Sequence, residues 1–223
     1  MRTFDEILDF AAQHHGSRLA VLEAASNGYL KDDLRTVSDS QYLSEMSQAV
    51  FSAGFNWTVI RNKWPGFMEA FKGFEPHAVA FFSDEDMDRL LSNTAIVRNG
   101  QKIKATIENA RFMVGVIKEH GSFGAFLEKW PEDDQAGLLA YLHKNGSRLG
   151  GATAQYFLRF AGYDAWITSR DVCAALVREG VLDKPAATSN SAKAKVDQAF
   201  TILHEESGQP RSVISRILAL SVG

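Results

Sequence analysis

The chain has 223 residues, of which 45% are hydrophobic and 23% are charged, with one cysteine and a formal net charge of −3. This composition predicts a globular chain with a substantial core, and it excludes a disordered chain, an internal disulfide and a four-cysteine zinc site. The acidic balance argues against binding nucleic acid through a general positive field. The charge is uneven, however: residues 1–92 hold 8 Lys+Arg against 14 Asp+Glu, and residues 93–223 hold 16 against 13.

The amino-terminal residues 1–6 (MRTFDE) carry acids where a signal peptide needs an apolar core. No stretch of the sequence approaches the length of a membrane span. We therefore expect a cytoplasmic protein without membrane contact.

Almost every segment has the apolar spacing of a helix, and no run alternates like a strand. Thr3 followed by Glu6 predicts a capping box at the first helix. Pro65 predicts a helix break. The sequence therefore predicts an all-α fold. The expected helices are residues 4–14, 18–26, 41–53, 57–63, 66–71, 77–82, 84–91, 101–120, 123–130, 132–143, 155–160, 168–178, 192–206 and 210–220.

A glycine-rich turn at residues 145–154 leads directly into the expected helix 155–160. Glycines allow close approach, and the first amides of a helix point outward at an anion with the helix dipole behind them. The pattern predicts phosphate binding, although an ordinary tight connection has the same pattern, and Lys144 also fits a solvated helix end. The residues expected to contact phosphate are Lys144, Gly146, Arg148, Gly150, Gly151 and Thr153.

The run 144–156 (KNGSRLGGATAQY) resembles the helix-hairpin-helix of the DNA-3-methyladenine glycosylase I family. Residues 53–57 (AGFNW) and 96–103 (IVRNGQKI), the latter continuing into 109–111 (NAR), resemble the same family in the same order. The likeness spans about residues 40 to 175, and the tail 214–221 resembles a divergent branch.

This resemblance implies the two-lobed helical fold of the helix-hairpin-helix glycosylases, with a DNA-binding cleft between the lobes. We expect a single glycosylase-like unit over residues 1–223. One lobe would be built from residues 1–83 and 166–223, and the hairpin-containing lobe from residues 84–165.

The resemblance also implies an enzyme that extrudes a base from DNA, holds it between aromatic faces and cuts its sugar bond. Trp57 matches the family tryptophan that stacks on the base, and a core position is the alternative interpretation of this residue. Phe51, Phe55 and Tyr29 are expected to line the same base-stacking pocket.

The catalytic group departs from the family pattern. The aspartate of the wider superfamily falls at Ser169, and the glutamate of the 3-methyladenine branch falls at Gln48 or Ala49. The nearest acid to the first position is Asp171, which also fits a first-turn acid favoured by the helix dipole. We expect Asp171 and Gln48 to be the catalytic residues, with Gln48 hydrogen-bonding a base edge through its amide.

No cofactor and no metal are expected. The family zinc site uses cysteines and histidines, whereas this chain has no cysteine near its amino terminus and has Asp171 at the place of one family histidine. Bifunctional relatives form a Schiff base through a lysine, and the corresponding residue here is Ala152. Strand cleavage by that route is therefore not expected.

These features predict a monofunctional DNA glycosylase that removes alkylated purines, foremost 3-methyladenine, from double-stranded DNA and acts as a monomer. N3-alkylated adenine is cationic and leaves its sugar readily, so extrusion and positioning supply much of the catalysis. The missing acids leave a second hypothesis, a non-catalytic helix-hairpin-helix protein that binds DNA or lesions. A third is a helical enzyme acting on a small nucleoside, which would lack a steep salt dependence.

Overall fold

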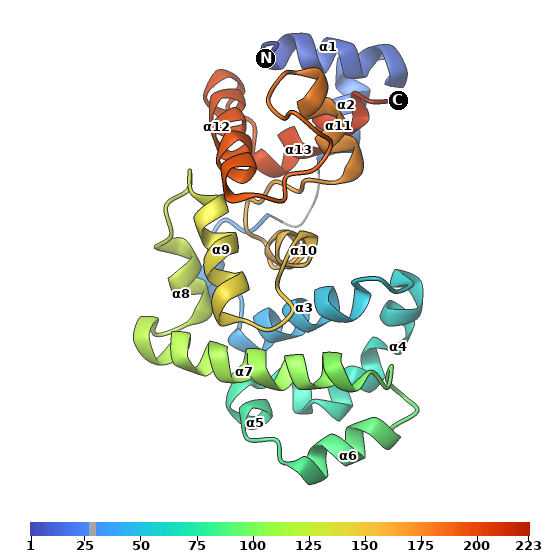
Figure 1. Cartoon of the computed structure of the whole chain (residues 1–223), viewed down its shortest axis with the longest axis vertical. Coiled ribbons are helices and arrows are strands. Elements are labelled where there is room, and N and C mark those ends of the chain that lie inside the picture. Colours follow the sequence, from blue (N-terminus) through green and yellow to red (C-terminus); the bar gives the residue numbers. More distant parts are fainter. Residues whose placement is uncertain (27–29) are drawn as a thin grey trace. The chain divides into compact units, whose positions relative to one another are not determined.

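The structure, a computed structural model, describes residues 1–26 and 30–223 (Figure 1). Within these ranges the chain is helical and contains no β-strand, so the all-α prediction is confirmed. The predicted position of Tyr29 lies outside the described residues. None of the described helices is both long and apolar enough to cross a membrane.

The chain divides into two compact units. Unit 1 comprises Met1–Leu30, Pro131–Leu138 and Gly162–Gly223, and unit 2 comprises Lys31–Trp130 and Leu139–Ala161. This division differs from the lobes expected from the sequence, because residues 31–83 belong to the same unit as the hairpin. The reason is that the helix at residues 39–52 packs on the helices at residues 100–120 and 152–160.

Unit 1 joins the two ends of the chain. Its carboxy-terminal helix packs on both amino-terminal helices and on the helix at residues 170–178. The predicted capping box is present, with the Thr3 side chain accepting from the Glu6 amide and the Glu6 side chain accepting from the Thr3 amide. The helices of unit 1 are α1 (Phe4–His15), α2 (Arg18–Ala25), α11 (Arg170–Arg178), α12 (Asn190–Ser207) and α13 (Arg211–Leu220).

Two carboxylates stabilise unit 1, of which Glu179 is buried and Asp197 is half-buried. Glu179 accepts hydrogen bonds from Arg2 Nη1 and Arg178 Nε, both at 2.8 Å. Asp197 accepts from Trp166 Nε1 at 2.7 Å, and burial raises the pKa of this carboxyl to about 6. The Arg2–Glu179 contact joins residues 177 positions apart and so ties the amino terminus to the end of α11, whereas the Trp166–Asp197 bond joins residues 31 positions apart.

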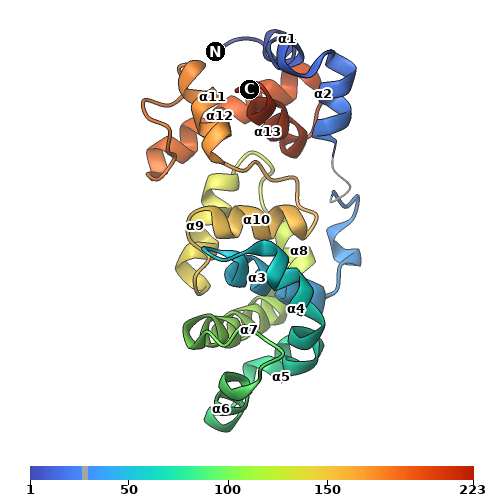
Figure 2. The same cartoon turned by 90° about the vertical axis from the view of Figure 1, so that its right-hand side faces the viewer.

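Unit 2 is arranged around its longest helix, α7, which packs on α3, α5, α6 and α8, while α3 also packs on α4 and α10 (Figure 1, Figure 2). Helix α9 (Gln135–Asn145) begins in unit 1 and ends in unit 2. The other helices of unit 2 are η1 (Leu34–Thr36), α3 (Asp39–Ser52), α4 (Trp57–Ala70), η2 (Lys72–Phe74), α5 (Pro76–Ala80), α6 (Asp84–Ser92), α7 (Gly100–His120), α8 (Phe123–Glu128) and α10 (Ala152–Phe160).

The predicted helix break at Pro65 is wrong, because α4 continues through this residue from Trp57 to Ala70. Aromatic packing explains the difference. The Trp64 ring stacks on Phe67 at 4.9 Å and on Phe74 at 5.3 Å, and Phe67 is fully buried. Packing of this stretch into the core offsets the cost of an interior proline, about 3 kcal/mol.

Candidate functional site

Trp57 is the first residue of α4 and lies on the surface of unit 2. The Asn56 side chain caps the helix by accepting from the amides of Thr58 at 2.9 Å and Val59 at 3.3 Å. The Trp57 ring packs edge-on against Tyr156 and Phe160 of α10, with centroid distances of 5.3 Å and 5.7 Å. It nevertheless keeps 39% of its surface exposed, so part of the side chain is accessible to a ligand.

The loop that carries Trp57 is held by Lys102 of α7. The Lys102 ammonium donates to the carbonyls of Phe51 at 2.8 Å and Ala53 at 2.7 Å, where α3 ends. A cation is favourable there because it meets the negative end of the helix dipole. The same ammonium lies 5.9 Å from the centroid of the Phe55 ring, which is 45% exposed. Burial lowers the pKa of Lys102, and the charge of Arg148 lowers it further.

Of the aromatic residues expected in a stacking pocket, Phe51 lies elsewhere. Its ring is fully buried and packs on Phe67 with a centroid distance of 4.6 Å. No face of the ring is open to a base, so the structure places Phe51 in the core. Among the predicted rings that the structure describes, Trp57 and Phe55 are the exposed ones.

Asn109 of α7 holds the glycine-rich turn through two hydrogen bonds. Its Nδ2 donates to the Ser147 carbonyl at 3.1 Å, and its Oδ1 accepts from the Ser147 amide at 2.6 Å. Asn109 is fully buried, so neither bond competes with bulk water. The turn is therefore a fixed element of unit 2.

The turn leaves a short run of amides open. Those of Gly150, Gly151 and Ala152 make no hydrogen bond within the described part of the chain, and Gly151, the residue before α10, has no side-chain cap. The φ of 57° and ψ of −132° at Gly151 are accessible essentially only to glycine. Three successive free amides at the start of a helix form an anion-binding arrangement.

At two of the predicted phosphate contacts, Gly146 and Thr153, the backbone amide is not free. The Gly146 amide donates to the Leu142 carbonyl at 2.9 Å, and the Thr153 amide donates to the Gly150 carbonyl at 3.2 Å. Neither amide is available to an anion. Gly146 has a steric role instead, because a Cβ there would lie 2.5 Å from Leu149 Cδ1.

Two cations flank the turn. Lys144 is exposed at the end of α9. Arg148 is exposed in the turn itself, where its Nη1 donates to Gln101 Oε1 at 3.0 Å and its φ of 59° lies in the left-handed region. Both side chains therefore lie on the surface, and Arg148 lies two residues before the first open amide.

The acids expected near the site lie in unit 1. Asp171 is exposed in the first turn of α11, whose cap is Ser169, a position that the helix dipole favours for an acid. Asp164 caps α13 by accepting from the amides of Arg211 and Ser212, both at 2.8 Å. Gln48 lies in unit 2, half-buried on α3.

Three residues of this region were not predicted from the sequence: Lys102, Asn109 and Glu45. Glu45 is half-buried on α3, and burial alone raises the pKa of its carboxyl to about 7. The signal for Glu45 was an acid among the apolar positions of its helix. Lys102 and Asn109 are polar residues at buried positions of α7, which the apolar stripe of that helix did not reveal.

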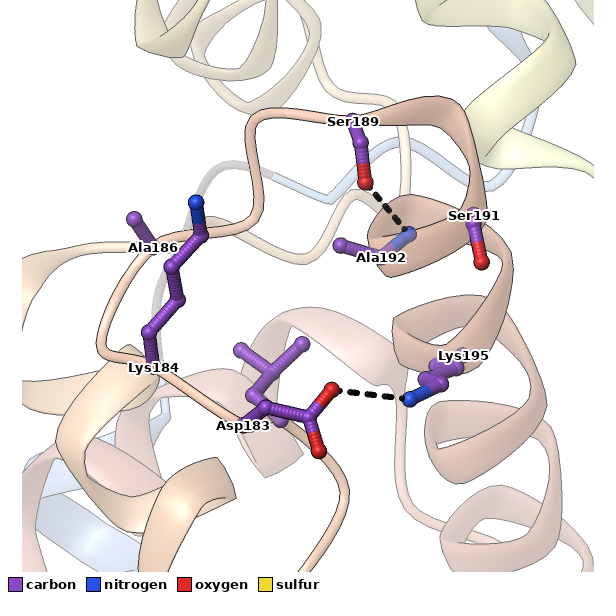
Figure 3. A pocket seen from close by; sticks show the side chains of 8 residues that line it. Asp183, Lys184, Ala186, Ser189, Ser191, Ala192 and Lys195 are labelled. Atoms are coloured by element: carbon purple, nitrogen blue, oxygen red, sulfur yellow. Dashed lines mark hydrogen bonds and ion pairs between the residues drawn. The ribbon is translucent and has the colours of Figure 1, made fainter.

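A separate concavity of about 240 Å³ lies in unit 1 beside the start of α12 (Figure 3). Lys195 at its edge pairs with Asp183 at 3.2 Å, and the Ser189 hydroxyl caps α12 by accepting from the Ala192 amide at 3.1 Å. None of the described residues that line this concavity is aromatic, so they offer no ring for stacking. In the described ranges, no group of three or more histidine, cysteine or acidic side chains could hold a metal ion.

Comparison with known proteins gives a family match over residues 34–144, which runs from η1 to the end of α9 and carries the description methyladenine glycosylase. The chain belongs to the methyladenine glycosylase family. Two curated relatives from this family are DNA-3-methyladenine glycosylase 1 of Escherichia coli, 37% identical over 92 residues, and DNA-3-methyladenine glycosylase of Haemophilus influenzae, 28% identical over 75 residues. These matches cover 40% and 34% of this chain and only 49% and 40% of the relatives.

The fold agrees with this family. A solved structure of 3-methyladenine DNA glycosylase I from Staphylococcus aureus is 27% identical, with a TM-score of 0.53 over 66% of this chain and 86% of that chain. The methyladenine glycosylase match includes the Trp57 loop and Lys102 and stops just before the open amides of the turn.

Replacing Asn109 by alanine is expected to loosen the turn. The change removes both bonds to Ser147 and leaves the Ser147 amide without its partner, which costs about 1–3 kcal/mol. NMR-detected hydrogen exchange should show the Ser147 amide exchanging at least tenfold faster. Asn62→Ala, at an exposed position of α4, is the control. Unchanged exchange at Ser147 would contradict the clamp.

Proposed function

We propose that the chain is a monofunctional DNA glycosylase that hydrolyses the N-glycosidic bond of alkylated purines, foremost 3-methyladenine, in double-stranded DNA. It would act as a monomer in base-excision repair. The observation that carries the proposal is that unit 2 combines three open amides at the start of α10 with an exposed tryptophan packed on the same helix. Family membership and the names of the relatives support the same activity.

In this proposal the turn binds one DNA strand. The amides of Gly150 to Ala152 bind a phosphate, and Arg148 and Lys144 add positive charge next to it. Contacts of this kind position the duplex without reading its sequence. Binding should therefore weaken steeply as the salt concentration rises.

The exposed rings would receive the extruded base. Trp57 offers a face for stacking, and Phe55 is the second exposed ring on the same loop. Base–aromatic stacking contributes about 1–3 kcal/mol per base. Water is the nucleophile that cleaves the sugar bond, and Ala152 provides no amine for a Schiff base, so the DNA strand stays intact. Gln48 is proposed to bond a base edge, and Asp171 to be the acid near the sugar.

The direct test is release of 3-methyladenine from methylated duplex DNA, resolved by chromatography. Trp57→Ala is expected to reduce the single-turnover rate at least tenfold, because the stacking face is lost while α4 and its Asn56 cap remain. Phe81→Ala, an aromatic residue that is 85% exposed, is the matched control and should leave the rate unchanged. Absence of released base above background would overturn the proposed activity.

A second candidate function is lesion binding without chemistry. It is favoured by one observation, the absence of a carboxylate at both Gln48 and Ala49, where the family places its glutamate. Binding to duplexes with an abasic site or a methylated base, without any released base, would support this alternative.

A further inference from the structure

Helix α3 carries a polar stripe on one face, defined as Gln41, Glu45, Gln48 and Ser52. Intervals of four, three and four residues place all four side chains on the same side of a helix. Their exposure decreases along the helix, from exposed at Gln41 through half-buried at Glu45 and Gln48 to 1% at Ser52. The stripe therefore leads polar groups inward to the end of α3, next to the loop that carries Trp57.

Two side chains of the polar stripe have no hydrogen-bond partner among the described residues. The buried Ser52 Oγ makes no hydrogen bond in the part of the chain that the structure describes. The Glu45 carboxyl likewise forms no hydrogen bond or ion pair with any described residue. Leaving a buried hydroxyl unpaired costs about 1–3 kcal/mol, so such groups in native proteins usually bond to water or to a ligand.

Aromatic residues lie on the helix that packs against α3. Helix α3 packs on α10, and α10 carries Tyr156 and Phe160, which contact Trp57. The Ser52 carbonyl accepts from the Phe55 amide at 3.0 Å, which joins the end of the stripe to the exposed loop. A ligand that satisfies these groups would combine a flat ring, hydrogen-bonding edges and a positive charge.

We propose that Glu45 and Ser52 recognise the positive charge and a ring edge of an N3-alkylated adenine, with Glu45 as the carboxylate that this chain uses against the cationic base. The inference rests on the proposed function, because it names the residues of that site that select its substrate. An ionised carboxylate at a partly buried position is unfavourable until a cation pairs with it. The raised pKa of Glu45 reports this desolvation. A neutral adenine supplies no such pairing.

The test uses two small probes and the full chain at pH 8. The fixed cation 3,9-dimethyladeninium mimics the damaged nucleoside without a cleavable sugar, and 9-methyladenine is its neutral counterpart. Calorimetric titration should show the wild-type protein binding the cation at least tenfold more tightly than the neutral base. Glu45→Gln should remove that preference. Glu69→Gln, which changes an exposed acid on α4, should keep it.

Ser52→Ala provides an independent check. It should weaken binding of both probes several-fold while the melting temperature stays the same or rises, because the variant removes a buried hydroxyl that has no partner. A merely structural serine would instead lower the melting temperature on replacement. Lower stability with unchanged binding would overturn the role of Ser52.

Parallel excision assays on methylated DNA separate the two levels of the proposal. If the wild-type protein releases base but Glu45→Gln retains the cation preference, the inference about Glu45 fails and the glycosylase function stands. If the wild-type protein prefers the cation but releases no base, the glycosylase function fails and the charge-recognition site stands. Loss of the preference in Glu69→Gln would also overturn the inference.

Discussion

Lys102→Met is expected to lower the free energy of unfolding by about 3 kcal/mol and the excision rate at least tenfold. Lys102 donates charge-assisted hydrogen bonds to the carbonyls of Phe51 and Ala53, and each such bond contributes about 1.5–3 kcal/mol. Methionine keeps the aliphatic stem but leaves both carbonyls at the end of α3 without a donor. The loop that carries Phe55 and Trp57 then loses its attachment to α7. Urea unfolding and single-turnover excision measure the two effects.

Lys104→Met is the matched control, since Lys104 lies on the same helix with an exposed side chain and only a 3.9 Å contact to Glu108. This variant should change the free energy of unfolding by less than about 0.5 kcal/mol. Equal losses in the two variants would show that any lost positive charge on α7 has this effect. The helix-capping role of Lys102 would then be wrong.

Glu45→Gln is expected to stabilise the protein at alkaline pH. The pKa of Glu45 is about 7 in the folded protein, against 4.5 for an ordinary glutamate, and desolvation is the cause. Because the folded state holds the proton more tightly, wild-type stability falls as the pH rises from about 4.5 to about 7. Above pH 7 the full penalty remains, since both states are then ionised. Glutamine carries no charge at any of these pH values and avoids the penalty.

The shift corresponds to a gain of about 1–3 kcal/mol for Glu45→Gln at pH 8, reduced from the full value because the side chain is only partly buried. The gain should disappear near pH 4.5. Urea unfolding at several pH values measures it, with Glu69→Gln as the control at an exposed position. Asp197, with its pKa raised to about 6, adds a trend of the same sign to every variant, so the difference between variants isolates Glu45. A gain independent of pH would show that packing and not charge is responsible.

Together the two Glu45 experiments distinguish a functional carboxylate from a structural one. A residue retained for folding should lose stability when its charge is removed. A residue retained for binding should gain stability and lose its ligand, because proteins tolerate desolvated charge at functional sites. Glu45→Gln is expected to follow the second pattern.

Local sequence signals predicted most of the secondary structure. The Thr3–Glu6 capping box and the start of α11 after Ser169 are formed by bonds between neighbours in the chain, so their residue types suffice to predict them. Pro65 shows the limit of local rules. Proline usually ends a helix, but the stacking of Trp64 on Phe67 and Phe74 stabilises a helix that continues through Pro65. Phe74 lies outside α4, so its contact with Trp64 cannot be predicted from the sequence of that helix.

The candidate site was predicted less completely. The glycine-rich turn and Trp57 were found because their pattern is continuous in the sequence. Phe51 and Phe55 are both aromatic and only four residues apart, but one lies in the core and the other is exposed, since α3 ends between them. Gly146 illustrates a similar error, because its amide is occupied by Leu142 of the preceding helix.

The sequence by itself determined the helical fold class, the helix caps, the position of the glycine-rich turn and the lack of a lysine at residue 152. Only the tertiary structure decided that Lys102 holds the end of α3, that Asn109 clamps Ser147, and that Glu45 is desolvated with no partner among the described residues. The physical reason is that caps and turns depend on residues a few positions apart. Burial and pairing depend on which distant helices pack together, and no local pattern records that.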